Sequence, residues 1–275
     1  MRWDEYYKKK DSLDVIILGS SHAYRTYDPA VIANGLGEEK SVFNFGSSAQ
    51  SPKTSYFVLN EVLENETPKL VVMDIYFLVF VGTDQLKNGR FNYEYMRKGK
   101  GRTAFFRNGF SFQEQVTLKL FPAFVYKTYL NGKFNKLLGR NFISTKKGIY
   151  QGNGFVSNSD TLSYKKLTTE NQFDYFETDF ESLAAENLKY LKKIKDRCKE
   201  KGIKLIFTTA TMPMVSVEKI KNYQQFHDFF IDLSRNCDIP FYDYNISRIT
   251  GLSDTADFYD DDHLNAMGAK KISSN

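Results

Sequence analysis

The chain has 275 residues, enough for one large domain or two small ones with a sizeable hydrophobic core. Its hydrophobic content of 41% and charged content of 26% are those of an ordinary folded protein and argue against a disordered chain. No run of about 18 apolar residues is present, and the N-terminal residues lack the apolar segment of a signal peptide, so neither a membrane span nor a leader is expected.

The net charge of +5 is distributed unevenly along the chain. Between Lys87 and Lys147 there are 14 basic residues and two acidic ones, and the rest of the chain is therefore net acidic. The two cysteines, Cys198 and Cys237, have no histidine or further cysteine nearby at metal-ligand spacing. A disulfide scaffold and a structural zinc site are both excluded on these grounds.

Short apolar segments rich in β-branched residues predict five buried parallel strands. In chain order they cover residues 15–18, 41–45, 70–73, 203–208 and 239–242.

Helical patterns fall between these strands. Asp28 and Ser51 each precede a proline, which predicts an N-cap followed by a proline at the first helical position, the second helix running to about Glu64. Capping-box spacing at Thr178 begins the clearest helix, which Gly202 ends. A further helix is predicted over residues 216–236, and the last begins near residue 265.

This alternation predicts an α/β fold with a parallel sheet, linked by right-handed crossovers and covered by helices on both faces. In such sheets, sites form beyond the carboxyl ends of the strands. Ser21, Gly46, Asp74 and Thr209 all follow predicted strand ends, so we expect them to converge at one edge.

The stretch from residue 83 to residue 164 breaks the alternation and contains the basic excess together with many aromatic residues. We interpret it as an insertion in a single domain (residues 1–275) whose core comprises residues 12–82 and 165–275. Clustered cations, interleaved aromatics and the apolar, basic-flanked residues 118–130 fit an anionic glycopolymer or an anionic membrane surface. Alternatively, the aromatics pack a subdomain and the lysines are merely solvated. Nucleic acid is disfavoured because no recognition motif accompanies the charge.

Two segments carry residues suited to nucleophilic catalysis. Ser21 follows a buried strand through Gly19, which permits a tight exit and exposes the hydroxyl. His263 supplies an imidazole base, and Asp260 a carboxylate to orient it. The backbone N–H groups of Ser21 and Gly46 are candidate donors to the oxyanion.

Each segment also has a structural interpretation. Residues 19–22 could form an ordinary strand-to-helix turn whose serines cap backbone groups, and residues 260–263 a solvated acidic loop that caps the next helix. His227 lies within a helical pattern and is interpreted as a surface or packed residue. His22, next to the proposed nucleophile, could contact the substrate or the oxyanion.

Taken together, these segments resemble the SGNH/GDSL hydrolase superfamily. Residues 19–22 are similar to its Gly-Asp-Ser block, with Ser21 as nucleophile, and residues 44–46 to its second block, whose glycine donates to the oxyanion. Residues 260–265 look like its Asp-x-x-His block. Serine in place of the first-block Asp is similar to the envelope-modifying branch, which includes the D-alanyl transfer protein of teichoic acids and the alginate O-acetylation proteins. The resemblance implies a flavodoxin-like, three-layer α/β/α sandwich with five parallel strands.

One block departs from the family pattern. The Gly-x-Asn-Asp block should follow the third strand, but residues 74–77 read Asp-Ile-Tyr-Phe. No asparagine is available there to complete the oxyanion hole, so Ser47, Tyr76 or a residue of the insertion would have to substitute.

The leading hypothesis is a serine esterase or O-acyltransferase acting on acyl esters, chiefly acetyl esters, of a carbohydrate or cell-envelope polymer. It requires no metal and no organic cofactor. The resemblance implies a cell-surface location with an anchor outside this chain, a cytoplasmic one being the alternative, and a membrane-bound acyltransferase or a membrane surface as partner. The second hypothesis is a non-catalytic protein that holds an anionic glycan on the basic insertion.

Overall fold

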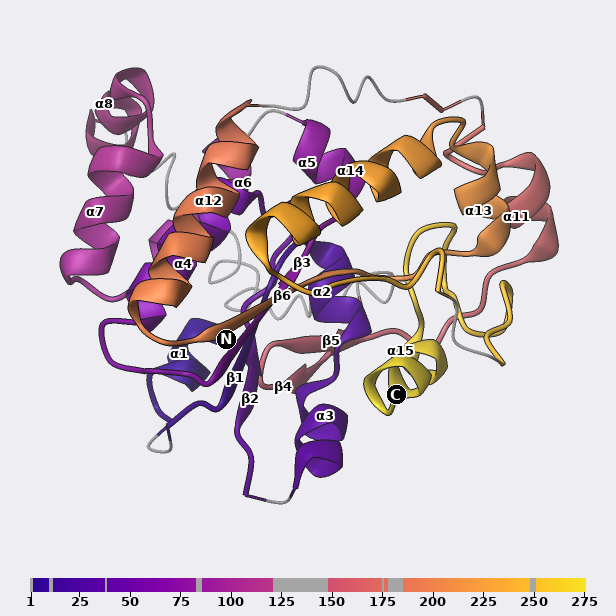
Figure 1. Ribbon diagram of the computed structural model, residues 1–275, viewed down its shortest axis with the longest axis horizontal. Coiled ribbons are helices and arrows are strands. Elements are labelled where there is room, and N and C mark those ends of the chain that lie inside the picture. Colours follow the sequence, from indigo (N-terminus) through magenta and orange to yellow (C-terminus); the bar gives the residue numbers. More distant parts are fainter. Residues whose placement is uncertain are drawn as a thin grey trace, which may run out of the picture.

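The computed structural model describes residues 2–9, 12–37, 39–82, 86–120, 148–174, 176–177, 185–247 and 251–275. Within them, a twisted parallel sheet lies between two layers of helices (Figure 1). This arrangement confirms the predicted α/β class and the three-layer architecture. Among the described residues, no helix combines the length and the apolar character needed to span a bilayer.

The five predicted strands form the sheet, with ends that differ from the prediction by at most two residues. Their order is β2-β1-β3-β6-β7, and every pairing is parallel. The strands are β1 (Val15–Leu18), β2 (Val42–Asn44), β3 (Leu70–Asp74), β6 (Lys204–Thr209) and β7 (Phe241–Asp243). The strand order reverses direction between β1 and β3, which is where ligands bind in doubly wound sheets.

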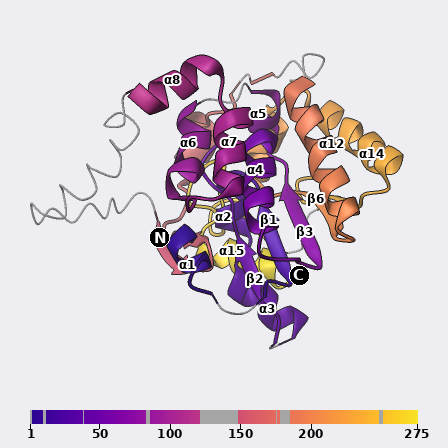
Figure 2. The same cartoon turned by 90° about the vertical axis from the view of Figure 1, so that its left-hand side faces the viewer.

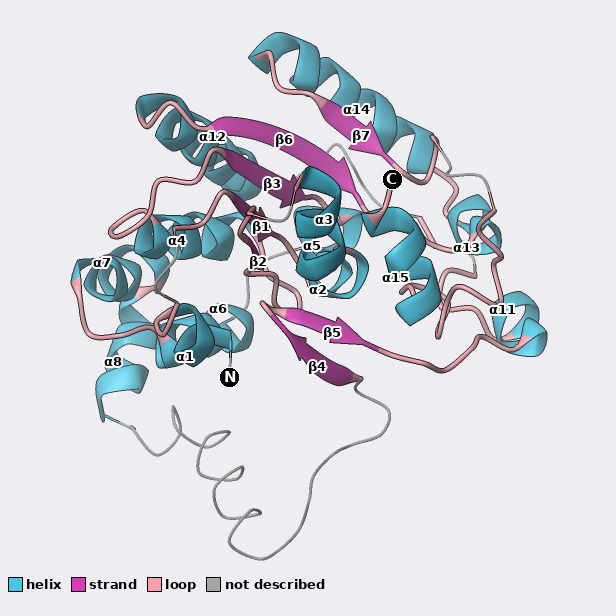
Figure 3. Ribbon diagram, turned by 90° about the horizontal axis from the view of Figure 1, so that it is seen from below, coloured by secondary structure: helices cyan, strands magenta, loops and turns pink. Residues whose placement is uncertain are grey.

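Alternate side chains of each strand enter two different cores. Ile16 and Leu18 pack with α4 (Pro52–Val62), α12 (Ala185–Glu200) and α14 (Tyr223–Cys237), whereas Val15 and Ile17 pack with α2 (Ser21–Thr26), α3 (Pro29–Leu36) and α15 (Ala266–Ser273). Figure 3 shows the two sets of helices on opposite sides of the sheet. Burial on both faces explains why the strands read as continuous apolar runs.

The helix caps predicted at Asp28 and Ser51 are confirmed. Asp28 accepts from the backbone N–H of Ala30 at 2.9 Å, and Ser51 from that of Thr54 at 3.1 Å. Asn265 caps α15 in the same way. Helix α12 ends before Gly202, which has a φ of +65°. The predicted start of that helix at Thr178 lies outside the described residues.

The single helix predicted over residues 216–236 is wrong. The structure has two helices there, α13 (Met214–Lys219) and α14, separated by residues 220–222, of which Ile220 is extended. The Ile220 side chain is buried, and the next backbone N–H, that of Lys221, donates to the carbonyl of Phe176. Tertiary contacts therefore interrupt a sequence whose local pattern favours one helix.

The stretch that interrupts the alternation contributes helices and a hairpin. Helices α6 (Leu86–Tyr95) and α7 (Lys100–Gly109) pack against α4, with α8 (Phe112–Leu120) beyond them (Figure 2). Strands β4 (Ile149–Gly152) and β5 (Phe155–Ser157) form an antiparallel pair apart from the main sheet. Three short helices complete the described elements: α1 (Arg2–Tyr6), α5 (Phe77–Val81) and α11 (Tyr164–Thr169). Most of the apolar stretch 118–130 lies outside the described residues.

Candidate active site

The turn after β1 presents Ser21 at the start of α2. Gly19 adopts a φ of +146°, and a Cβ there would lie 2.8 Å from the Cβ of Asp74, so only glycine fits. Ser20 is the N-cap of α2, and its hydroxyl accepts from the backbone N–H of His22. This capping role leaves Ser21 as the serine whose hydroxyl is free to face the loop that carries His263.

Three side chains from opposite ends of the chain lie within hydrogen-bonding distance of one another. Ser21 Oγ is 2.9 Å from His263 Nε2. The other ring nitrogen, Nδ1, is 3.1 and 3.2 Å from the two carboxylate oxygens of Asp260. If Nδ1 carries the hydrogen and donates to Asp260, then Nε2 is free to accept from Ser21. The geometry is that of a serine nucleophile, a histidine base and an orienting carboxylate.

Asp260 is fixed in this position by the backbone of its own loop. Its Oδ1 also accepts from the N–H groups of Asp262, at 3.0 Å, and of His263, at 2.6 Å. Burial raises the pKa of Asp260, but the hydrogen bonds and charge of His263 outweigh burial and bring that pKa below its ordinary value. The carboxylate is therefore ionised at neutral pH, as an orienting group requires.

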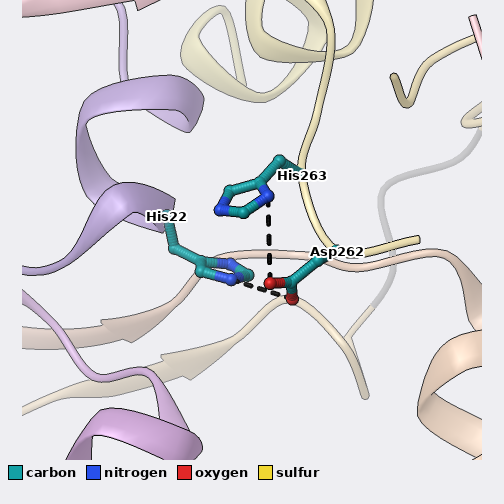
Figure 4. Close-up of side chains that lie close together, drawn as sticks. All are labelled: His22, Asp262 and His263. Carbon is teal, nitrogen blue, oxygen red and sulfur yellow. Dashed lines mark ion pairs between the residues drawn. The ribbon is translucent and has the colours of Figure 1, made fainter. Parts of the chain in front are cut away.

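A second buried group of side chains adjoins the first (Figure 4). The His22 ring stacks on Tyr76 with centroids 3.8 Å apart, and its Nε2 is 3.0 Å from Asp262 Oδ1, an approach not aligned with the ring N–H direction. The Tyr76 hydroxyl donates to Asp262, 3.0 Å from each oxygen. Asp262 Oδ2 in turn lies 3.8 Å from Nδ1 of His263.

Asp262 was not singled out as a site residue from the sequence, although it directly precedes His263. Burial raises its pKa, but the charges of His22 and His263 and the hydrogen bond from Tyr76 lower it to about 2. The signal in the sequence that could have pointed to Asp262 is the run of three aspartates at residues 260–262. Asp261, between the other two, points elsewhere and accepts from the backbone and the side chain of Gln172.

Most of the groups expected to receive the oxyanion are engaged within the protein. The N–H of Gly46 donates to Asn44 Oδ1 at 2.9 Å, and the N–H of Ser47 to the carbonyl of Gly19 at 3.1 Å. The Ser47 hydroxyl donates to Gln50, and the Tyr76 hydroxyl to Asp262. The backbone N–H of Ser21, by contrast, makes no hydrogen bond within the described part of the chain.

The other residues expected at this edge are structural. Asp74 is buried beneath Gly19, where its Oδ1 accepts from the N–H of Ala210 and from the Tyr27 hydroxyl. Burial raises the pKa of Asp74 to about 7. Thr209 donates its hydroxyl to the carbonyl of Ile75. In the described part of the chain, neither side chain makes a hydrogen bond to Ser21.

His22, Asp262 and His263 also form the one described group with donor atoms close enough for a metal ion. Both ring nitrogens of His263 are already engaged, Nε2 by Ser21 and Nδ1 by Asp260. A metal held by His263 would displace one of these partners and so remove the base from the serine. The donor set fits base catalysis better than metal binding, and we assign no metal site.

Comparison with known proteins finds similarity in solved structures only. No family model and no curated protein matches the chain. A Bacteroides fragilis protein described as an acylhydrolase matches 99% of this chain and 90% of its own, with 13% identity and a TM-score of 0.47. An acetyl xylan esterase matches 94% and 95%, with 10% identity and a TM-score of 0.46. A Desulfitobacterium hafniense protein described as a lipolytic member of the G-D-S-L family matches 94% of each chain, with 10% identity and a TM-score of 0.43. With TM-scores below 0.5, none of the three defines the function of this chain.

Proposed function

We propose that this protein is a serine esterase or O-acyltransferase acting on acyl esters, acetyl esters foremost, of a carbohydrate or cell-envelope polymer. One observation carries the proposal: Ser21 Oγ lies 2.9 Å from His263 Nε2, while Asp260 contacts the opposite ring nitrogen. Ser21 and His263 are 242 positions apart in the sequence, so local structure alone does not bring them together.

The chemistry follows from these contacts. His263 removes the proton from Ser21 as its oxygen attacks the ester carbonyl, and Asp260 stabilises the imidazolium that forms. In this proposal the backbone N–H of Ser21, which makes no hydrogen bond in the described part of the chain, receives the oxyanion. His263 then protonates the leaving alcohol, and water or a sugar hydroxyl releases the acyl group from Ser21.

The basic insertion supports a polymeric, anionic acceptor. A cavity of about 410 Å³ lies between α6, α7 and α8, with Lys98, Arg102 and Lys119 among its lining residues. The Arg102 guanidinium lies 4.6 Å from the centre of the Tyr93 ring, and the Lys119 ammonium 5.3 Å from that of Phe106. Cations beside aromatic faces suit a sugar chain with carboxylate or phosphate groups.

The same cavity favours a second candidate function, that of a non-catalytic protein holding an anionic glycan. The two functions differ in what they require of Ser21. An enzyme needs the hydroxyl for turnover, whereas a binding protein needs only the cations of the insertion.

The deciding experiment incubates the wild type and Ser21→Ala with an acetylated oligosaccharide, with and without an unacetylated acceptor. Mass spectrometry then follows free acetate and acetylated acceptor. We expect turnover by the wild type alone, and the ratio of the two products distinguishes hydrolysis from transfer. Absence of turnover and of an acyl-enzyme on every ester tried, together with saturable binding of an anionic polysaccharide, would favour the second function.

A further inference from the structure

The loop that carries His263 presents two carboxylates to its Nδ1 atom. Asp260 lies at 3.1 Å and Asp262 at 3.8 Å. A serine–histidine–carboxylate site needs only one such group. We propose that Asp262 is a positioning residue that shares with Asp260 the stabilisation of the His263 imidazolium; the proposal rests on the esterase or acyltransferase function proposed above.

Asp262 is held in place by residues from two other elements. The Tyr76 hydroxyl, from the end of β3, reaches both carboxylate oxygens at 3.0 Å. His22, from α2, brings its Nε2 to 3.0 Å of Oδ1. Tyr76 and His22 are both buried, and Asp262 is only 7% exposed. A carboxylate fixed in this way cannot rotate out to solvent, so its charge stays next to the base.

The His22 ring packs beside this carboxylate and contacts two neighbouring rings, those of Tyr76 and His263. It stacks on Tyr76 and lies 4.6 Å, centroid to centroid, from the His263 ring at an interplanar angle of 33°. This packing leaves little room for water between the two imidazoles.

The consequence concerns one proton transfer. As the Ser21 oxygen bonds to the ester carbon, its proton moves to Nε2, and the carbonyl electron pair moves to the ester oxygen. The positive charge then spreads over both ring nitrogens of His263, next to two ionised carboxylates. An opposite charge within about 4–6 Å favours the charged form of a titratable group.

The groups that face His263 come from three elements. Its own loop contributes Asp260, Asp262 and Tyr259, whose ring centre lies 5.6 Å from that of His263. Helix α2 contributes Ser21 and His22. Tyr76, just after β3, acts on His263 through its hydrogen bond to Asp262. Arg25 of α2 lies over the Tyr259 ring at 4.8 Å. Asp262 is the nearest charge after Asp260, so its removal has the clearest expected effect.

The test compares Asp262→Asn with Asp261→Asn, which removes a charge from the same loop but contacts Gln172 instead of the histidines. Two readouts are used: the acid limb of the kcat/KM profile against pH, and the NMR titration of the three imidazole rings. For Asp262→Asn we expect the acid limb and the His263 titration midpoint to move to lower pH by about one unit, with kcat/KM about tenfold lower. Asp261→Asn should match the wild type in both.

An unchanged acid limb and an unchanged His263 titration in Asp262→Asn would overturn the proposal and leave Asp262 a purely structural role. Circular dichroism checks the fold, and Asp262→Ser is the second charge-removing variant if Asp262→Asn does not fold. The NMR titration needs no turnover. A wild type without esterase activity would therefore overturn the proposed function, while the titration would still decide whether Asp262 acts on His263.

Discussion

The carboxyl edge of the sheet and the insertion both concentrate charged and aromatic side chains, but they use them differently. At the edge, Asp260, Asp262 and the two histidines contact one another at fixed distances in largely buried positions. In the insertion, Lys98 and Lys119 are exposed around an open cavity. Fixed, buried pairs suit proton transfer, whereas exposed cations suit a mobile, charged ligand.

The two regions are joined by polar contacts. Asn92 of α6 donates to Ser47 and Gln50, in the loop after β2, at 2.9 and 3.0 Å. On the hairpin, the carbonyl of Asn153 accepts from the N–H of Asn44 at 2.8 Å. The insertion therefore braces the loop that contains Gly46 and Ser47. Changes in the two regions should nevertheless separate catalysis from polymer binding.

The largest effect is expected for the proposed nucleophile and base. Ser21→Ala and His263→Ala should each lower kcat/KM on a small acetyl ester by a thousandfold or more, because each removes a participant in the acyl transfer step. His227→Ala is the matched control, since His227 pairs with Asp243 on Nδ1 and makes no described contact with Ser21. Retention of more than a tenth of the activity by Ser21→Ala would contradict the assignment.

The second-largest effect is expected on the free energy of unfolding, and it arises from a residue at the carboxyl edge of the sheet. Burial raises the pKa of Asp74 to about 7, so the folded protein keeps its proton over a range of pH where the unfolded chain has lost it. The stabilising contribution of the neutral carboxyl is thus present at acid pH and is lost as pH rises through about 4 to 7. Asp74→Asn should remove this dependence and raise the free energy of unfolding at pH 8 by on the order of 4 kcal/mol.

Chemical denaturation at pH 5 and pH 8 measures this difference for the wild type and for Asp74→Asn. The matched control is Asp28→Asn at the N-cap of α3, where asparagine caps a helix about as well as aspartate, so its effect should be small at both pH values. If the free energies of unfolding of the wild type and of Asp74→Asn differ by the same amount at pH 5 and at pH 8, the buried-carboxyl account is contradicted.

Much of this organisation could be predicted from the sequence because it is local. The strands follow from apolar runs, the caps from Asp28 and Ser51, and the candidate site from short segments around Ser21 and His263. The break at Ile220 could not, since a carbonyl distant in sequence, that of Phe176, accepts from the N–H of the next residue.

The finer features of the site depend on long-range contacts in the same way. Asp262 gains its place beside His263 from Tyr76, 186 residues earlier. The side chain of Asn44 accepts from the N–H of Gly46, and it is held in that position because its amide donates to the carbonyls of Ala23 and Tyr27, about twenty residues earlier. No spacing rule in the sequence distinguishes the direction of Asp261 from that of Asp262.

A third prediction tests the junction of the two regions. Gly154, on the β4–β5 turn, has a φ of +89°, and a Cβ there would overlap the carbonyl of Asn44. Gly154→Ala should therefore lower the free energy of unfolding by about 3 kcal/mol. Gly37→Ala is the comparison, because Gly37 also has positive φ but nothing lies near its Cβ position. Equal losses in the two variants would show that backbone strain, and not the packing of the hairpin, sets the cost.

The smallest effect is expected in the insertion. Lys98→Gln and Lys119→Gln together should weaken binding of an anionic polysaccharide about tenfold and reduce its salt dependence, because two cations are lost from the cavity. Turnover of a small acetyl ester should stay unchanged. Lys270→Gln, an exposed lysine on α15, is the matched control. Equal loss of small-ester turnover in the double variant would show that the two regions are not separable.

The central claim is that His263 activates Ser21 for nucleophilic attack, and labelling with a fluorophosphonate probe tests it most directly. Peptide mapping by mass spectrometry should find one adduct, on Ser21, which is absent in Ser21→Ala and forms much more slowly in His263→Ala. An adduct on Ser20, or labelling that is equally fast in wild type and His263→Ala, would contradict the claim.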